Sequence, residues 1–203
     1  VNLFMKIRDA TVSDVEHLVF LINLAGEGLP MFLWRNMGEP GQDPLALGAF
    51  RAAREKGSFS YRNAKILEID GVIAGMTLSY ALPDPYDLGV MDDCPAVVRP
   101  LLELEAMVPG SWYVNAIATY EHFRGRGVAS ALMSTCEKTA LAASATSLSL
   151  IVSSENRLAQ SFYLKLGYEE LASQPVNSFP GGPAGGQWLL MAKDLSSQPS
   201  TGA

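Results

Sequence analysis

The distribution of hydrophobic and polar residues predicts strands and helices in alternation along the chain. Residues 111–119 carry no charge and are mostly β-branched, aromatic or small, which is typical of a buried strand. Residues 59–69 and 72–82 flank Asp70-Gly71, a dipeptide that strongly favours a tight hairpin turn between two antiparallel strands. The other strands predicted by the pattern cover residues 6–9, 145–152, 168–172 and 187–192.

Apolar residues recur at helical spacing between these strands. Val15, Leu18 and Ile22 place one apolar face on a helix over 14–25, and Gly26 marks its end. The other helices predicted by spacing and by end signals cover residues 29–37, 45–56, 95–107, 127–142 and 156–166. The order of the elements describes a mixed α/β protein without internal repeats.

The length of 203 residues fits one domain, expected over residues 5–195 and followed by a flexible tail at 196–203. Residues 83–109 interrupt the strand pattern and are interpreted as an inserted segment. The segment has one basic residue, Arg99, and six carboxylates: Asp84, Asp87, Asp92, Asp93, Glu103 and Glu105. These carboxylates either attract a cationic ligand through their local field or form a solvated face.

Composition excludes several classes of function. The formal net charge of −6 argues against nucleic acid as a main partner, because basic patches supply most of that affinity. The two histidines, His17 and His122, cannot form a histidine-rich metal site, and a Ser-His-Asp hydrolase is disfavoured. Cys94 and Cys136 are too few for a disulfide scaffold and are expected to be reduced, and no metal is expected. No apolar run reaches the roughly 18 residues of a membrane span, so the expectation is a soluble cytoplasmic protein without a membrane partner.

Arg124, Gly125, Arg126 and Gly127 stand between the strand at 111–119 and the helix after it. Glycines allow a positive φ, and successive backbone N–H groups can then turn toward one small volume. The first turn of the helix adds unpaired N–H groups and the positive end of the helix dipole, so the loop suits a phosphate. The alternative is a strand-to-helix turn that needs glycine for its geometry alone.

Two motifs carry a resemblance to a known family. Arg124, Gly127 and Ala129 fit R-x-x-G-x-A, and residues 156–168 fit N-x-x-A-x-x-F-Y-x-x-x-G-[FY]. A dinucleotide-binding loop would need a third glycine at Ser130, and no Walker A pattern occurs. In this order and spacing, the two motifs resemble those of the GNAT superfamily of N-acetyltransferases.

The resemblance implies a mostly antiparallel, twisted sheet of about six or seven strands with helices on both faces. It also implies that strands 111–119 and 145–152 splay apart to admit the pantetheine arm of acetyl-CoA, the donor substrate. The residues implied in binding acetyl-CoA are Ile117, Ala118, Thr119, Arg124, Gly125, Arg126, Gly127, Val128, Ala129, Asn156 and Tyr163.

Tyr163 and Asn115 are the predicted catalytic residues. The resemblance implies that Tyr163 protonates the leaving thiolate or hydrogen-bonds its sulfur, and the alternative is an aromatic packed on a neighbouring strand. Leu158 and Phe162 are expected to face the core, which leaves Tyr163 to point into a cleft. The superfamily often has a glutamate on this strand, and this chain has none there. Asn115 is the only side chain with strong hydrogen-bonding groups in the middle of the strand, and it either holds a proton-carrying water or satisfies a bulged backbone.

The inserted segment is expected on the acceptor side, and its carboxylates are alternative candidates for the base that deprotonates the acceptor amine. These carboxylates are Asp92, Asp93, Glu103 and Glu105. The expected reaction is direct attack of a primary amine of a small molecule on acetyl-CoA in a ternary complex. The alternatives are a protein or peptide amine as acceptor, or a non-catalytic acyl-CoA sensor. Three aromatic residues either line the acceptor cleft or belong to the core: Phe32, Trp34 and Trp112. The sequence leaves the oligomeric state open, and a homodimer is one option.

Overall fold

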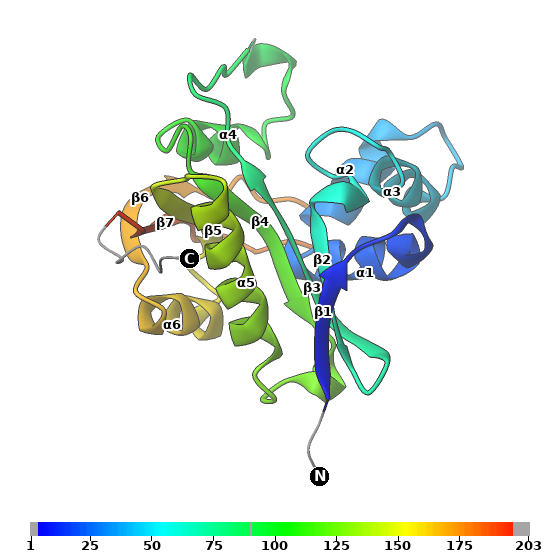
Figure 1. The fold of residues 1–203 in the computed structure, drawn as a ribbon. Coiled ribbons are helices and arrows are strands. Elements are labelled where there is room, and N and C mark those ends of the chain that lie inside the picture. The colour runs from blue at the N-terminus through cyan, green and yellow to red at the C-terminus, as the bar shows by residue number, and fades with distance from the viewer. Residues whose placement is uncertain (1–3, 90, 197–203) are drawn as a thin grey trace. The chain divides into compact units, whose positions relative to one another are not determined.

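The computed structural model describes residues 4–89 and 91–196, and within them it has seven strands in one sheet. The strands are β1 (Met5–Asp9), β2 (Ala64–Ile69), β3 (Val72–Ala81), β4 (Trp112–Thr119), β5 (Ser147–Ser153), β6 (Glu169–Pro175) and β7 (Gln187–Asp194) (Figure 1). Their order is β1-β2-β3-β4-β5-β7-β6. β4 and β5 run parallel, whereas β1–β2, β2–β3, β5–β7 and β6–β7 are antiparallel. The expected mixed, mostly antiparallel sheet is confirmed.

The described residues also form six α-helices. They are α1 (Val15–Ala25), α2 (Leu29–Met37), α3 (Pro44–Ala52), α4 (Arg99–Glu105), α5 (Val128–Ala142) and α6 (Arg157–Lys165). α1, α2, α5 and α6 lie where the apolar spacing predicts them, whereas α3 and α4 are shorter than predicted. No single helix in the described chain has the length and apolarity to cross a bilayer. The two segments Val12–Ala25 and Leu29–Met37, which are separated by a sharp bend, reach that length and apolarity only when they are counted together.

Strand β2 starts at Ala64 and not at residue 59 as predicted. A short 3-10 helix, Tyr61–Asn63, takes up the preceding residues, and the hydroxyl of Ser60 accepts a hydrogen bond from the N–H of Arg62 at 3.1 Å. This local cap competes with the extended conformation that the aromatic residues favour. The hairpin after β2 is confirmed, because Asp70 and Gly71 both have a positive φ, 51° and 80°.

The chain folds as two compact units, and each is described by itself. The described part of the first comprises residues 4–80, 115–136 and 179–182, and that of the second comprises 81–89, 91–114, 137–178 and 183–196. The division assigns parts of β4 and α5 to each unit. The expected single domain over 5–195 stays a prediction, and the predicted tail beyond residue 196 lies outside the described residues.

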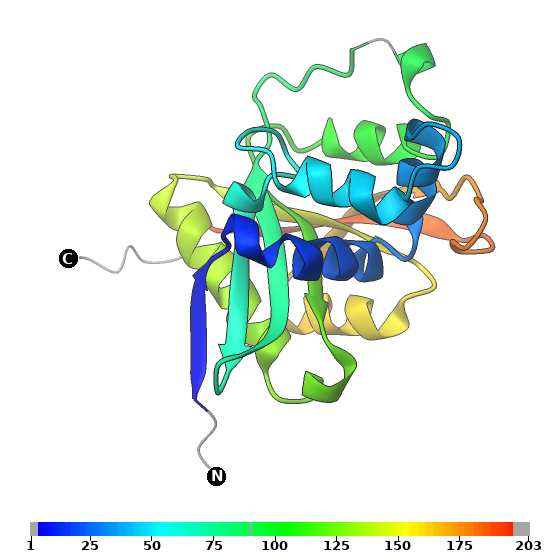
Figure 2. The ribbon, with the colours of Figure 1, turned by 90° about the vertical axis from the view of Figure 1, so that its right-hand side faces the viewer.

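Three helices of the first unit, α1, α2 and α3, gather on one side of β1–β3 (Figure 2). Leu18, Ile22, Ile66 and Met76 are almost fully buried between these layers. Trp34 joins them at 4% exposure, so it belongs to the core and not to an acceptor cleft. A second cluster, which includes Leu67, Ile69, Phe123, Val128 and Leu132, packs the start of α5 against the sheet.

The second unit is organised around β5, β7 and β6. α4 packs against β6 and β7, and Lys193 of β7 forms an ion pair with Glu137 of α5 at 2.7 Å. On α6 the expectation for Leu158 is wrong, because this side chain is 87% exposed. The one buried residue that α6 contributes is Tyr163.

Candidate active site

The loop between β4 and α5 has the backbone conformation that its glycines predict. Gly125 and Gly127 have φ values of 72° and 81°, and no atom lies within 4 Å of the position of a Cβ at either residue. The glycines are therefore required by the backbone conformation and not by lack of space. The same open space leaves room for a ligand beside the main chain.

The first turn of α5 supplies unpaired donors. The first backbone hydrogen bond of the helix runs from the N–H of Ala131 to the carbonyl of Gly127 at 3.0 Å. Within the described chain, no backbone acceptor is found for the N–H groups of Gly127, Val128, Ala129 and Ser130. These donors stand at the positive end of the helix dipole, and together they form a site for an anion.

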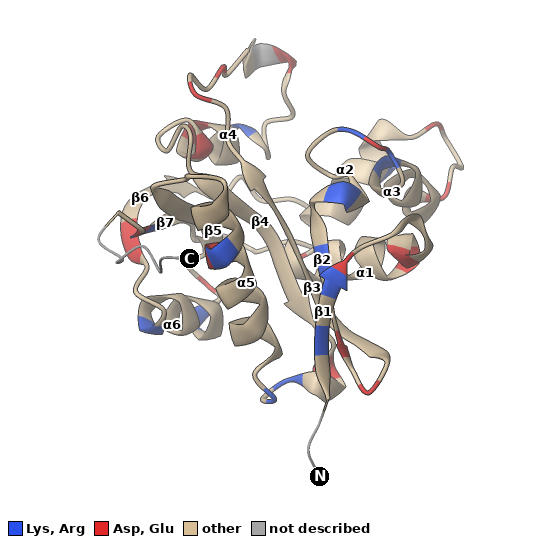
Figure 3. Cartoon of the chain, in the orientation of Figure 1, with Lys and Arg blue, Asp and Glu red and all other residues tan. Residues whose placement is uncertain are grey.

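Two exposed arginines flank these donors, and Figure 3 marks the basic positions in the loop before α5. The guanidinium of Arg126 lies 5.6 Å from the centroid of the Phe123 ring, and neither Arg124 nor Arg126 forms an ion pair with a described residue. Phe123 is buried, so it is a fixed support for the Arg126 side chain. Both cationic groups are thus available to an anionic ligand.

Strand β4 alternates buried and partly exposed residues in its second half. Ala116 and Ala118 are buried, whereas Asn115, Ile117 and Thr119 are half-buried. The amide of Asn115 forms no hydrogen bond with another described side chain or main-chain group. The register between β4 and β5 pairs Trp112 with Leu148, Tyr113 with Ser149 and Val114 with Leu150.

One residue of this region was missed by the sequence analysis. A Cβ on Gly75 of β3 would lie 2.6 Å from the carbonyl oxygen of Ala118 and 2.9 Å from Cγ1 of Val128. Only glycine permits this approach of β3 to the end of β4 and the first turn of α5. An isolated glycine inside a predicted strand is the signal that indicates such a close contact.

The second motif forms the start of α6. The side chain of Asn156 accepts a hydrogen bond from the N–H of Ala159 at 3.1 Å, which confirms it as the N-cap. The amide of Gln160 donates to the carbonyls of Ser153 and Ser154 at 3.0 and 2.8 Å. These bonds tie the helix to the end of β5 and hold the motif in a defined conformation.

Tyr163 is buried among aromatic rings. Its exposure is 8%, and its ring centroid lies 5.4 Å from Phe162 and 5.8 Å from Tyr168. Phe162 was expected to face the core and Tyr163 to point into a cleft. In the structure Tyr163 is the buried residue of the pair and Phe162 is half-buried. The packing fixes the position of the Tyr163 ring, and its predicted catalytic role stays a prediction.

The carboxylates of the inserted segment differ sharply in their surroundings. Asp93 and Glu103 are exposed, and the side chain of Asp92 lies outside the described residues. Glu105 is partly buried, and the hydroxyl of Tyr86 donates to its Oε2 at 2.7 Å. Burial raises the pKa of Glu105 above its ordinary value, although hydrogen bonds from Tyr86 and Tyr113 oppose the rise.

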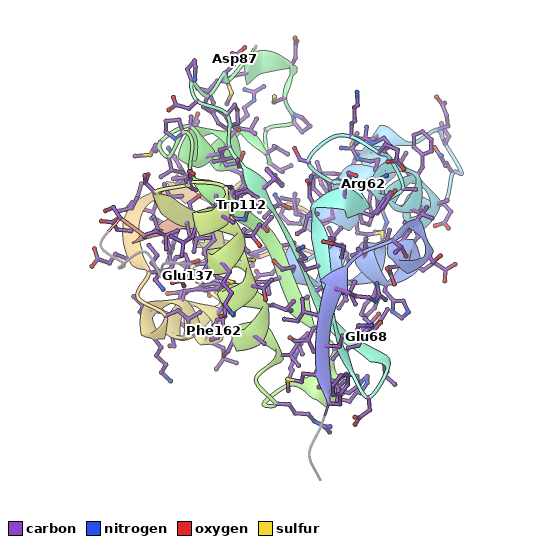
Figure 4. The ribbon with its side chains drawn as sticks, in the orientation of Figure 1. Arg62, Glu68, Asp87, Trp112, Glu137 and Phe162 are labelled. Atoms are coloured by element: carbon purple, nitrogen blue, oxygen red, sulfur yellow. The ribbon has the colours of Figure 1, made fainter. Side chains whose placement is uncertain are left out.

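The remaining aromatic residues are placed as follows. Phe32 of α2 packs against the buried ring of Phe179, with 5.3 Å between centroids, in the first unit. Trp112 of β4 is half-buried, and its indole N–H has no hydrogen-bond partner among the described residues (Figure 4).

No cluster of three or more potential metal ligands occurs in the part of the chain that the structure describes.

The predicted site residues fall in both units. The loop residues, Asn115, Ile117, Ala118 and Thr119 belong to the first unit, whereas Asn156 and Tyr163 belong to the second. The structure thus brings together the anion-binding loop with the end of β4. It separately brings together the capped start of α6 with its buried tyrosine.

Comparisons with known proteins agree with the sequence motifs. The Acetyltransferase (GNAT) family model matches residues 32–168. Among solved structures, one acetyltransferase is 20% identical with a TM-score of 0.63, and the alignment covers 93% of this chain and 98% of the other. The polyamine N-acetyltransferase of Drosophila melanogaster, described as forming N-acetylagmatine, is 15% identical with a TM-score of 0.65 and coverages of 95% and 100%.

A third similar structure is the ribosomal-protein-alanine N-acetyltransferase of Brucella melitensis. It is 18% identical with a TM-score of 0.60, and the alignment covers 94% of this chain and 99% of the other. At these identities the likenesses show the fold. No curated protein matches the sequence.

Proposed function

The chain belongs to the acetyltransferase (GNAT) family, and from this premise we propose that it transfers an acetyl group from acetyl-CoA to a primary amine of a small molecule. The observation that carries the proposal is the loop before α5. Its two glycines have positive φ, its donors are unpaired, and two arginines flank it without ion-pair partners. This combination suits the diphosphate of coenzyme A.

In the proposed complex the N–H groups of Gly127, Val128 and Ala129 bind the diphosphate. Arg124 and Arg126 add formal positive charge, which acts over short range because salt screens the net negative charge of the chain. The backbone groups of Ile117 and Thr119 bind the pantetheine amides in this proposal, because a strand whose neighbour splays away, as in the family, retains N–H and C=O groups for a ligand. Asn156 and the backbone at Ala118 and Gly125 complete the proposed contacts.

The proposed reaction is direct attack of the neutral amine on the thioester carbonyl carbon. The C–S bond breaks as the C–N bond forms, and the sulfur leaves as a thiolate. Tyr163 donates a proton or a hydrogen bond to that sulfur, and Asn115 holds a water beside the reacting atoms. No metal ion takes part in the proposed chemistry.

The proposed acceptor is a cationic amine. The inserted segment supplies carboxylates, and Figure 3 shows acidic positions on this segment and on α4. The Drosophila enzyme with a similar fold forms N-acetylagmatine, the acetylated form of a cationic amine. An alternative acceptor is a peptide amine, favoured by the similarity in fold to the ribosomal-protein-alanine enzyme.

Turnover of acetyl-CoA with a panel of acceptors tests the proposal. The panel contains agmatine, a diamine, a monoamine without a second cationic group and a peptide with an N-terminal alanine. Mass spectrometry identifies the acetylated product. We expect acetylation of the cationic small amines. Acetylation of the peptide alone would favour the alternative acceptor. Binding of acetyl-CoA without turnover of any amine would indicate an acyl-CoA sensor.

A further inference from the structure

We propose that the chain binds a second copy of itself, through a basic surface on the first unit of one copy and an acidic surface on the second unit of the other. The basic surface, at the end of α3 and just after it, consists of Phe50, Arg51, Arg54 and Lys56. The acidic surface, in the inserted segment and on α4, consists of Asp84, Asp87, Leu88, Asp93 and Glu103. The proposed contact does not depend on the proposed function.

The cations of the basic surface lack carboxylate partners. Arg51, Arg54 and Lys56 form no ion pair with a described residue. Glu55, the carboxylate that lies among them in the sequence, is paired instead with Arg62. Burial and the neighbouring charge of Arg54 lower the pKa of Arg51, so its charged form is disfavoured in the isolated molecule. A negatively charged partner would stabilise these cations.

The carboxylates of the acidic surface are also unpaired. Its four exposed carboxylates without an ion pair to a described residue are Asp84, Asp87, Asp93 and Glu103. Glu105 is not part of this surface, because it is partly buried and bound to Tyr86. Figure 4 places Asp87 at the end of the segment that extends away from α4. The segment therefore presents uncompensated negative charge to solvent.

Apolar side chains accompany the charges on both surfaces. Gly48 and Ala52 occupy the buried side of α3, where a Cβ on Gly48 would lie 2.9 Å from the ring of Trp34. Phe50 lies on the outer side of the helix and is 69% exposed. Leu88 of the acidic surface is 37% exposed. An exposed apolar side chain among charged ones is the arrangement of an interface, with an apolar centre and a polar rim.

Charge complementarity favours a second copy as the occupant of the basic surface. Figure 3 marks basic positions around α3 and acidic positions on the inserted segment and on α4. The formal net charge of −6 disfavours a nucleic acid, which most of the molecule would repel. Two copies carry the same net charge, but salt screens exposed charges beyond about 8 Å at physiological strength. Opposite charges in direct contact therefore outweigh the distant repulsion.

The expected association is weak and depends on salt. Exposed ion pairs contribute little individually, so several pairs must act together with the two apolar side chains. In a two-fold dimer each copy supplies both surfaces, and the contact then occurs twice. The same surfaces in an open arrangement would join copies into chains. Measurement of the molar mass distinguishes these two arrangements.

The test reverses the charge of each surface in separate variants. The basic-surface variant carries Arg54→Glu and Lys56→Glu, and the acidic-surface variant carries Asp87→Lys and Glu103→Lys, all at exposed positions. Sedimentation equilibrium of the full chain measures the Kd in about 50 mM and about 500 mM NaCl, and we expect the wild-type Kd to rise at least about 10-fold in the higher salt. Neither variant should associate with itself.

Mixing the two variants separates a direct contact from a general effect of charge. In the mixture, the reversed basic surface of one variant meets the reversed acidic surface of the other, and the two native surfaces also match. The mixture should therefore regain a complex, with a Kd within about 10-fold of the wild-type value. Phe50→Ser, which changes no charge, should also weaken the association.

The matched control carries Arg157→Glu and Lys165→Glu on α6. These residues are exposed, and the control has the same net charge as the basic-surface variant, so it should associate as the wild type does. A wild-type monomer at both salt concentrations would overturn the proposal. Association that survives both charge reversals, or a mixture of folded variants that stays monomeric, would overturn it as well. Circular dichroism establishes the fold of each variant, and none of these outcomes depends on acetyl transfer.

Discussion

Gly75 of β3 packs so tightly against Ala118 of β4 that a Cβ on Gly75 would lie 2.6 Å from the carbonyl oxygen of Ala118. The same Cβ would lie 2.9 Å from Cγ1 of Val128, in the first turn of α5. The absence of a side chain at Gly75 thus allows the first turn of α5 to lie close to the sheet. The position of the turn depends on a residue far from it in the sequence.

Gly75→Ala should destabilise the protein and weaken the binding of acetyl-CoA. The added methyl group forces β3 and the loop apart, and overpacking of this kind costs about 1–3 kcal/mol. Denaturant unfolding measures the loss of stability, and calorimetry measures the affinity. Gly185→Ala is the matched control, because no atom lies within 4 Å of its added Cβ. Equal behaviour of the two variants would contradict the assigned role of Gly75.

Ala129→Glu should abolish diphosphate binding without unfolding the protein. A carboxylate in the first turn of α5 interacts favourably with the helix dipole, by about 0.3–1 kcal/mol, so the helix should remain stable. The same charge occupies the proposed phosphate position and repels the ligand. We expect the Kd for coenzyme A to rise at least about 100-fold, or about 2.7 kcal/mol. Ala129→Gln, of similar size without the charge, should retain more affinity, and unaltered binding by Ala129→Glu would place the ligand elsewhere.

Tyr163→Phe should lower kcat at least about 100-fold, with little change in the KM for acetyl-CoA. The phenylalanine ring retains the packing against Phe162 and Tyr168, so the loss should come from the missing hydroxyl. Steady-state kinetics with saturating amine measures the effect. Tyr168→Phe removes a hydroxyl from the neighbouring buried ring, at a position where the motif accepts either residue, and should be active. Undiminished turnover by Tyr163→Phe would remove the tyrosine from the mechanism.

Asp14 should stabilise the fold through Arg8, and this contribution should be lost in acid. Both oxygens of Asp14 accept hydrogen bonds from the Arg8 guanidinium, at 2.7 and 2.8 Å, which lowers the pKa of Asp14 from 3.8 to about 2. A lowered pKa stabilises the folded state above the unfolded pKa, so stability should fall as the pH drops from about 4 to about 2.

The Asp14 contribution at neutral pH is about 2 kcal/mol from the size of this shift. Urea unfolding of Asp14→Asn should show that loss at neutral pH and a shallower decline in acid. Asp9→Asn removes a 78% exposed carboxylate from the neighbouring ion pair with Lys65, and it should change stability far less. A wild-type stability that is flat between pH 4 and pH 2 would refute the role of Asp14.

Local patterns predicted most of the elements because their causes are local. The apolar spacing of α1 and α5, the turn at Asp70-Gly71 and the cap at Asn156 each depend on residues within one or two turns of chain. The family followed from two motifs for the same reason. Backbone conformation at Gly125 and Gly127 is a local requirement that the residue types reveal.

Tertiary structure decided what depends on distant neighbours. The sequence alone determined most of the elements, the glycine turn before α5 and the family, because glycine, cap and periodicity signals act over a few residues. It could not show that Gly75 contacts Ala118, that Leu158 is exposed, or that Glu105 alone among its segment's described carboxylates is held by tyrosines. Those facts arise where residues far apart in the chain meet, since burial and hydrogen-bond partners are properties of the packed molecule.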